Sequence, residues 1–271
     1  MRARPGRLVL LGHPVRHSLS PRLQDAALKA AGIALRYEAL DVVPSEIQGV
    51  LAGLRAEGAA GNVTIPYKEL VARACDELSP LAERIGAVNT FWSEGGLLFG
   101  DNTDVGGFEQ AVRVLLGGLP AAGHVAVLGA GGAAAGVLAA IEGWQGSAAL
   151  VYNRTMERAR ALAARYPSTV TVAASAEEAV AGASLVVNAS SVGLRDDSLP
   201  VPIEALSPSA AVLDLVYRPG ETPFVRAARA RGHRAADGTR MLVEQGALAF
   251  ERWFGLVPNR AVMWEAVQIA P

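Results

Sequence analysis

Lys68, in the stretch GNVTIPYKEL at residues 61–70, is a residue whose type invites a chemical explanation. Lysine and arginine together number 25 in this chain, yet only Lys29 and Lys68 are lysines. Arginine stays charged in proteins, whereas a lysine can release and regain a proton. We therefore interpret Lys68 as a candidate for proton transfer, although chance use of lysine explains the composition equally well.

Two hydroxyl side chains precede a predicted helix near the N-terminus. The stretch GHPVRHSLSP places Ser18 and Ser20 in a short loop between an apolar strand and a helix with Pro21 at its first position. Hydroxyls and the free N–H groups of a helix start are good ligands for a carboxylate. We predict a carboxylate cradle here, and Ser20 is also the expected N-cap of the helix.

Other polar residues of the same region lie at predicted strand ends and helix starts. Thr64 ends a strand one helical turn before Lys68, and Asn89 lies in GAVNT. Asp104 in GDNTD begins a helix. A lysine beside a carboxylate can donate a proton, accept it back and stabilise a developing oxyanion. The set suits a small polyhydroxylated acid that bears a reducible carbonyl.

A glycine-rich turn in the second half of the chain has the pattern of a dinucleotide site. In HVAVLGAGGAAAG, Gly129, Gly131 and Ala134 satisfy G-x-G-x-x-A between a predicted strand and a helix. The first glycine permits the tight turn, the second lets the backbone approach a pyrophosphate, and the third small residue lets helix pack on strand. The alternative is a bare tight turn in an Ala/Gly-rich chain.

The end of the next predicted strand favours NADP over NAD. An NAD site usually carries Asp or Glu there to hold the ribose 2′-hydroxyl. Here AALVY is followed by NRTMER, with Arg154 and Arg158 at a helix start, where cations oppose the helix dipole. A 2′-phosphate would offset that cost; the alternative is two solvated arginines with Glu157 beside them.

Composition indicates a metal-free, soluble protein of the cytoplasm. Hydrophobic residues make up 51% of the 271, and a net charge of −1 gives no reason to expect nucleic-acid or membrane partners. A single cysteine, Cys75, fits a reducing compartment. The N-terminal apolar run is too short for a signal peptide, and the four histidines show no metal-ligand spacing.

The alternation of short apolar runs with helical patterns predicts an α/β fold with two domains and largely parallel sheets. We expect a substrate-binding, catalytic domain formed by residues 1–105 and 239–271, and a Rossmann-type NADP-binding domain at 106–238. The two C-terminal helices are expected to pack back onto the first domain. Glu94, Gly95 and Gly96 are expected to join two strands in a turn.

The order of the short motifs along the chain resembles the shikimate dehydrogenase family. The motifs are HSLSP, NVTIPYK, GAVNT, GDNTD, GAGGA, NRT with Arg158, NASSVG, DLVY and EQGALAF. The resemblance covers nearly the whole chain, and the N-terminal motifs are more specific than the glycine turn. It implies NADPH-dependent reduction of 3-dehydroshikimate to shikimate, in the pathway to chorismate and the aromatic amino acids.

The resemblance also implies a role for individual residues of the site. Lys68 and Asp104 would form the catalytic pair, and Ser18 and Ser20 would bind the substrate carboxylate. The remaining substrate contacts would come from Thr64, Asn89, Asp104, Tyr217 and Gln245. His13 stands where asparagine is common in the family.

On the cofactor side, the resemblance implies three groups of contacts. The pyrophosphate would be held by Gly129, Ala130, Gly131, Gly132 and Ala133. The adenosine 2′-phosphate would be bound by Asn153, Arg154, Thr155 and Arg158. Leu215 and Gly238 would lie near the nicotinamide. Thr239 and Arg240 stand where small or apolar residues are commoner, which puts the affinity of the neighbouring cleft rim in question.

Three other functions stay open at this point. A quinate/shikimate dehydrogenase that uses NAD would keep the first domain, but the arginine pair opposes it. A methylenetetrahydrofolate dehydrogenase would not need the serine cradle. A non-catalytic NADP-sensing regulator would not need Lys68 and Asp104. The sequence leaves the choice between monomer and homodimer open.

Overall fold

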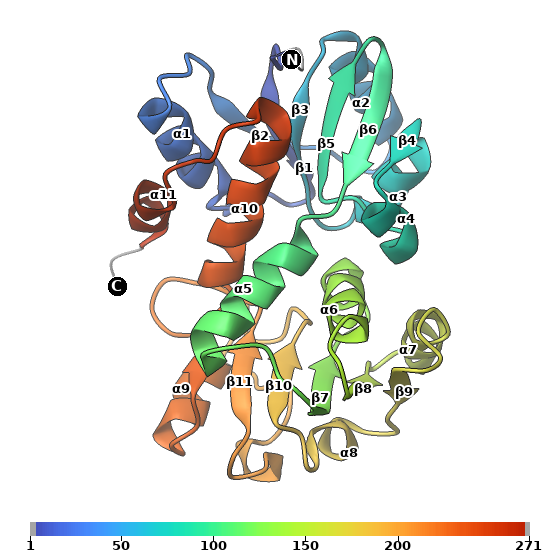
Figure 1. The fold of residues 1–271 in the computed structure, drawn as a ribbon, viewed down its shortest axis with the longest axis vertical. Helices are drawn as coiled ribbons and strands as arrows, with labels where there is room; N and C mark the ends of the chain where they lie inside the picture. Colours follow the sequence, from blue (N-terminus) through green and yellow to red (C-terminus); the bar gives the residue numbers. More distant parts are fainter. Residues whose placement is uncertain (1–3, 269–271) are drawn as a thin grey trace. The chain divides into compact units, whose positions relative to one another are not determined.

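The computed structural model describes residues 4–268, which form two compact units (Figure 1). One unit runs to Gly107 and resumes at Leu242, and the other spans Phe108–Met241. Both boundaries fall inside helices, namely α5 (Asp104–Leu116) and α10 (Thr239–Phe254). Each unit is built around one six-stranded sheet.

The sheet of the first unit is mixed, with the strand order β2-β1-β3-β5-β6-β4. β1 pairs in parallel with both β2 and β3, whereas β5 runs antiparallel to β3 and β6. Since β4 also pairs in parallel with β6, three of the five pairings are parallel, which confirms the prediction of largely parallel sheets. The tight turn at Gly95 and Gly96 joins β5 and β6 as an antiparallel pair, as expected from the sequence. The strands are β1 (Leu8–Gly12), β2 (Tyr37–Asp41), β3 (Ala60–Val63), β4 (Glu77–Leu78), β5 (Thr90–Glu94) and β6 (Leu97–Asp101).

The helices of the first unit connect these strands and, with the C-terminal helices, pack around them. They are α1 (Ser20–Ala30), α2 (Ile47–Ala56), α3 (Lys68–Ala74), α4 (Pro80–Ile85), most of α10, and α11 (Arg260–Val267). α11 packs against α1, which confirms that the C-terminal helices return to the first unit. α10 also approaches α1 closely, since a Cβ at Gly246 would lie 2.3 Å from the Leu23 side chain.

The start of α1 differs from the prediction. Ser20 is the first residue of the helix rather than its N-cap, and the cap position is taken by Leu19 without a side-chain hydrogen bond. Instead, the Ser20 backbone N–H donates to Ser18 Oγ, and the Ser18 hydroxyl donates to Ser20 Oγ. The two hydroxyls are thus bonded to each other, and the hydroxyl that accepts an N–H at the helix start belongs to Ser18 rather than to Ser20.

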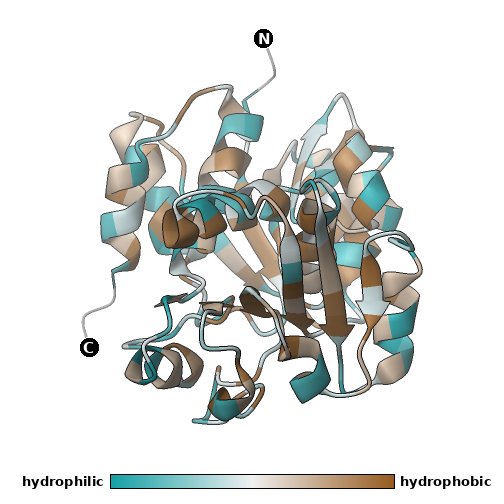
Figure 2. Cartoon of the chain, turned by 60° about the horizontal axis from the view of Figure 1, so that its bottom comes forward, coloured by the Kyte–Doolittle hydropathy of each residue, from teal (hydrophilic) through white to brown (hydrophobic). Residues whose placement is uncertain are grey.

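The hydrophobic core of the first unit contains the central strands and the helices beside them. Ile47, Leu54 and Phe91 are among its fully buried members. Across the chain, strands carry much of the hydrophobic colour in Figure 2. Cys75 lies at the edge of this core, and burial raises the pKa of its thiol to about 12. A thiol with so high a pKa is a poor nucleophile near neutral pH.

The second unit has an all-parallel sheet with the order β12-β11-β10-β7-β8-β9. The chain winds outward from β7 through β8 and β9, then returns to build β10, β11 and β12 on the other side. This is the Rossmann-type arrangement, in which the reversal beside the first strand marks the usual ligand site. The strands are β7 (Gly123–Leu128), β8 (Ser147–Tyr152), β9 (Val170–Val172), β10 (Leu185–Asn188), β11 (Ala211–Asp214) and β12 (Ala235–Ala236).

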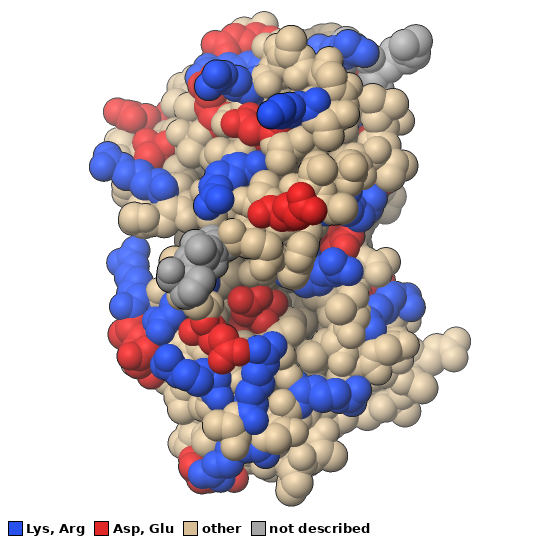
Figure 3. All heavy atoms as spheres, turned by 90° about the vertical axis from the view of Figure 1, so that its left-hand side faces the viewer, with Lys and Arg blue, Asp and Glu red and all other residues tan. Residues whose placement is uncertain are grey.

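The helices of the second unit include α6 (Gly132–Glu142), α7 (Met156–Ala163), α8 (Ala176–Val180) and α9 (Pro223–Ala230), with a short 3-10 helix at Ile203–Ala205. Residues of β10 and β11 are buried throughout, as is typical of parallel strands covered on both faces. Among residues 4–268, no helix is long and apolar enough to cross a membrane. Basic and acidic side chains are interspersed on the face in Figure 3.

Candidate active site

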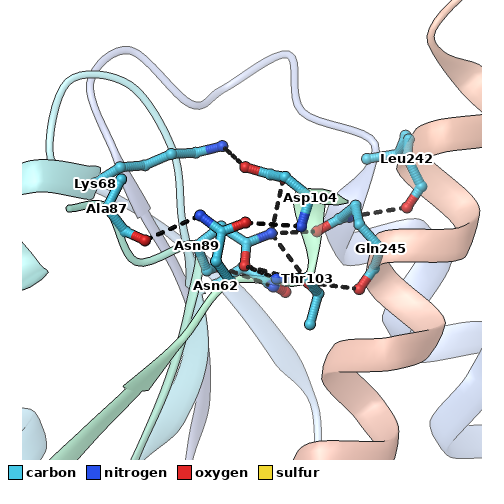
Figure 4. A network of polar contacts seen from close by, with 9 residues as sticks. Asn62, Lys68, Ala87, Asn89, Thr103, Asp104, Leu242 and Gln245 are labelled. Carbon is cyan, nitrogen blue, oxygen red and sulfur yellow. Dashed lines mark hydrogen bonds and ion pairs between the residues drawn. The ribbon is translucent and has the colours of Figure 1, made fainter. Parts of the chain in front are cut away.

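Lys68 and Asp104 form a close ion pair within the first unit. Lys68 begins α3 and Asp104 begins α5, and Lys68 Nζ lies 2.5 Å from Asp104 Oδ2 (Figure 4). The two side chains are only 14% and 6% exposed. A hydrogen bond with both partners charged is short and strong, so the pair is well placed to hold and move a proton.

Asn89 orients the carboxylate of this pair. Its Nδ2 donates to Asp104 Oδ1 at 2.8 Å, while its Oδ1 accepts from the Thr103 backbone N–H at 2.7 Å. The same Nδ2 lies 3.2 Å from Oε1 of Gln245, on α10. Gln245 is fixed in turn, since its Nε2 donates to the Leu242 carbonyl at 2.8 Å. The structure thus brings together Lys68, Asn89, Asp104 and Gln245.

Two buried asparagines support this group and were not singled out from the sequence. Asn102 Oδ1 accepts from the Asp104 N–H at 3.0 Å, and its Nδ2 donates to the Ala87 carbonyl at 2.9 Å. Asn62 Nδ2 donates to the Asn89 carbonyl at 3.1 Å. Asn62 lies in the motif NVTIPYK and Asn102 in GDNTD. Their closeness in the sequence to Thr64 and Asp104 could have marked them as residues of the site. Most of their bonding partners lie far away in the sequence.

The serine loop and Thr64 emerge at one edge of the first sheet. Ser18 follows β1, and Thr64 follows β3, which is the parallel neighbour of β1. Carboxyl ends of parallel strands meet at the same edge, where ligands usually bind. Ser18 Oγ and Ser20 Oγ are 3.2 Å apart. Among the hydrogen bonds of the described residues, none joins this pair to the Lys68 group.

The glycine turn of the second unit leaves a helix start open. Gly129 has a φ of +125°, and a Cβ there would meet the Ala189 carbonyl oxygen at 2.7 Å. Gly131 is the N-cap of α6, makes no side-chain cap, and has no atom within 4 Å of its Cβ position. The N–H groups of α6 therefore begin beside open space, which fits a pyrophosphate. Ala130, Gly132 and Ala133 complete this segment.

Arg154 and Arg158 flank the start of α7 after β8. Both are exposed, and in the part of the chain that the structure describes neither has an ion-pair partner. The neighbouring Glu157 lies 3.8 Å from Arg160 instead. Arg154 precedes the helix, and Arg158 lies in its first turn. Two unneutralised cations beside an uncapped helix start fit an added phosphate.

The turn between β8 and α7 is held by a hydrogen bond from one of its own side chains to its backbone. Asn153 Nδ2 donates to the Thr155 carbonyl at 2.9 Å. Thr155 occupies the N-cap position of α7 without a side-chain cap. The hydroxyl of Thr155 therefore does not close the helix end. The Arg158 N–H donates to the Thr155 carbonyl at 3.1 Å, so the N–H groups of Met156 and Glu157 are the ones that fit an anion.

The segment after β11 carries the remaining predicted residues. Leu215 and Tyr217 are half-buried and follow directly on the strand end at Asp214. A Cβ at Gly238 would lie 2.2 Å from the Leu215 carbonyl oxygen, so only glycine lets the chain pass Leu215 this closely. Thr239 and Arg240 are the first two residues of α10. Gly238 thus permits the close approach of these two segments, and its N–H donates to the Val216 carbonyl at 3.0 Å.

Comparison of the sequence with known proteins shows similarity to shikimate dehydrogenases. The shikimate dehydrogenase substrate binding domain family matches residues 10–91, and the shikimate 5'-dehydrogenase C-terminal domain family matches 238–268. A Thermus thermophilus protein named shikimate dehydrogenase (NADP(+)) is 44% identical over 97% of this chain and 98% of its own length. An Exiguobacterium protein of the same name is 40% identical over 94% of this chain and 95% of its own.

Solved structures give the same picture. Shikimate 5-dehydrogenase from Thermus thermophilus, in complex with NADP(H) and shikimate, is 43% identical, with a TM-score of 0.87 over 96% of this chain and 97% of that one. Quinate dehydrogenase from Corynebacterium glutamicum, in complex with NAD, has the same TM-score at 31% identity, covering 96% of this chain and 97% of its own. The overall fold is therefore common to enzymes with different cofactors, and the cofactor must be argued from side chains.

Proposed function

The chain belongs to the shikimate dehydrogenase family, and from this premise we propose that it reduces 3-dehydroshikimate to shikimate reversibly with NADPH. The observation that carries the proposal is the buried Lys68–Asp104 ion pair, held by Asn89. A lysine and a carboxylate in contact suit the proton transfer that accompanies reduction of a ketone.

The first unit would bind the substrate and the second would bind NADP. Ser18 and Ser20 hydroxyls would receive the substrate carboxylate. The ring hydroxyls would be contacted by Thr64, Asn89, Asp104 and Gln245, and the family resemblance assigns a substrate contact to Tyr217 as well. Because Asn89 and Gln245 are each anchored by further hydrogen bonds, their amides are oriented before the substrate arrives.

The bound cofactor would supply a hydride to the carbonyl carbon as NADPH, and would receive it back from the same carbon of the alcohol as NADP. Lys68 Nζ would donate a proton to the oxygen that becomes a hydroxyl, and would take it back in the reverse direction. Its positive charge would also stabilise the negative charge that develops on that oxygen. Asp104 holds the ammonium group in place through the 2.5 Å contact. Its negative charge would also favour return of the proton to Lys68 Nζ in the reverse reaction.

The cofactor contacts follow from the second unit's helix starts and loops. Gly129, Ala130, Gly131, Gly132 and Ala133 would enclose the pyrophosphate. Asn153, Arg154, Thr155 and Arg158 would bind the 2′-phosphate, and Leu215 and Gly238 would lie at the nicotinamide. The two exposed arginines, without an ion-pair partner among residues 4–268, support NADP over NAD. We place the enzyme in the cytoplasm, because its one cysteine is a free, partly buried thiol.

The glycines of the turn predict two different losses. Gly129→Ala should lower thermal stability as well as NADP affinity, because φ is +125° and the new methyl would meet the Ala189 carbonyl. Gly131→Ala should barely change the unfolding temperature, since no atom lies within 4 Å. It should still weaken NADPH binding by about tenfold or more, because the methyl group fills the space facing the helix start.

Thermal unfolding without cofactor and NADPH titration of both variants measure the two effects separately. Gly131→Ala serves as the steric control for Gly129→Ala, since both substitutions add one methyl group. Unchanged NADPH affinity in Gly131→Ala would place the pyrophosphate somewhere other than this turn.

The activity itself is tested by following nicotinamide absorbance with purified protein. Shikimate and quinate are each offered with NADP and with NAD, and the expected result is fast turnover of shikimate with NADP. Preference for NAD, or for quinate, would favour a quinate/shikimate dehydrogenase. NADPH binding without turnover of either acid would favour a non-catalytic regulator and contradict the proposal.

A further inference from the structure

Asp214 is a fully buried carboxylate that the proposed reaction does not use. It is the last residue of β11 and has no exposed surface. Its Oδ1 accepts from Asn188 Nδ2 at 2.8 Å and from the Val216 N–H at 3.1 Å, and its Oδ2 accepts from Thr222 Oγ1 at 2.6 Å. Burial raises the pKa of Asp214, and these donors oppose the rise. Burying a carboxylate is costly, so its position calls for a reason.

The first partner, Asn188, holds the loop after the neighbouring strand. Asn188 ends β10 and lies in register with Asp214 in the parallel pair. Its Oδ1 accepts from the Ser190 N–H at 3.1 Å and from the Ser190 Oγ at 2.6 Å, and its Nδ2 donates to the Val192 carbonyl at 3.1 Å. Residues 189–193 are therefore tied to the same pair of side chains, and Ala189 faces the Gly129 turn.

The other two partners fix both ends of the segment after β11. The Val216 N–H binds Asp214 two residues beyond the strand. Thr222, the N-cap of α9, binds the carboxylate from the far end and also accepts from the Val225 N–H at 3.3 Å. The Asp214 carboxylate thus binds both ends of the loop that carries Leu215 and Tyr217. Leu215 gains one more restraint, because its N–H donates to the Asn188 carbonyl at 2.9 Å.

We infer that Asp214 is a positioning residue that sets the backbone of residues 215–217 against the nicotinamide end of the cofactor. The inference rests on the proposed function, which places NADP at this edge of the sheet. The adenosine end is recognised elsewhere, after β8, by Arg154 and Arg158. Loss of Asp214 should therefore weaken binding and slow hydride transfer without changing the preference for the 2′-phosphate.

The alternative is that Asp214 stabilises the fold and nothing else. The two roles differ in what the folded enzyme does, because a purely stabilising residue leaves cofactor affinity unchanged once the protein is folded. They are separated by variants of equal size with different hydrogen-bonding capacity. Asp214→Leu removes both acceptors, whereas Asp214→Asn keeps an oxygen for Asn188 and Val216 and turns its amide toward Thr222 Oγ1.

The experiment measures NADPH and NADH dissociation constants, kcat, and the KM for shikimate in folded, full-length enzyme. Asp214→Leu should raise both dissociation constants by about tenfold and lower kcat, with their ratio unchanged. Asp214→Asn should recover most of the loss. The KM for shikimate should change much less. Glu177→Gln, at an exposed carboxylate on α8 of the same unit, is the control and should behave like wild type.

A second pair of variants decides the matter if Asp214→Leu does not fold. Thr222→Val keeps the volume and removes one donor to Asp214, and should shift affinity in the same direction by a smaller factor. Thr222→Ser retains the hydroxyl and should match wild type. Wild-type affinity and kcat in folded Thr222→Val or Asp214→Leu would overturn the inference, as would a changed NADPH/NADH ratio. A wild-type enzyme that fails to bind NADPH would instead contradict the proposed function.

Discussion

Lys68→Arg is expected to lower kcat by roughly two to four orders of magnitude, the range that general acid–base catalysis supplies. The substitution keeps the positive charge, so attraction to Asp104 and to a developing oxyanion is largely retained. Arginine does not give up its proton near neutral pH, and its planar group cannot reproduce the 2.5 Å contact of Nζ with Oδ2. The KM for shikimate should change far less than kcat.

Initial rates in both directions, with NADP and NADPH, measure this effect. The chain offers a matched control, since its only other lysine, Lys29, is exposed on α1. Lys29→Arg should leave kcat and KM unchanged. If Lys68→Arg turns over like wild type, proton transfer occurs elsewhere and Lys68 serves in binding alone.

The double variant Arg154→Ala, Arg158→Ala is expected to lose NADP affinity while keeping NAD affinity. A hydrogen bond to a charged group contributes about 1.5–3 kcal/mol, so each arginine should account for roughly ten- to a hundredfold in the dissociation constant. NAD lacks the 2′-phosphate and should bind nearly as before. The enzyme would then discriminate little between the two cofactors.

Titration with NADPH and NADH, and the KM for each cofactor, give the two losses independently. Arg160→Ala is the control, because Arg160 lies on the same helix but faces Glu157 at 3.8 Å. It should affect neither cofactor. An equal loss for NADP and NAD in the double variant would mean that the pair supports the structure of the turn.

The local features of the molecule could be read from the sequence because they depend on neighbours along the chain. The Gly129 turn follows a strand and opens a helix, as its spacing predicted. Lys68 and Asp104 are the first residues of α3 and α5. The family resemblance and the choice of NADP rested on short motifs of this kind, whereas the α/β class rested on the alternation of apolar runs with helical patterns. The comparisons confirm all three.

Only the tertiary structure decided which distant residues meet. The mixed sheet depends on β5 pairing with β3, and Asn89 contacts Asp104 because that pairing places their segments side by side. Ser20 was expected to cap α1, yet its hydroxyl bonds to Ser18. Asp214 lies in the motif DLVY, but the sequence did not indicate its hydrogen bonds, because the partners lie on another strand and at the far end of a loop. Hydrogen bonds across such separations depend on the packed sheet, and no spacing within one segment encodes them.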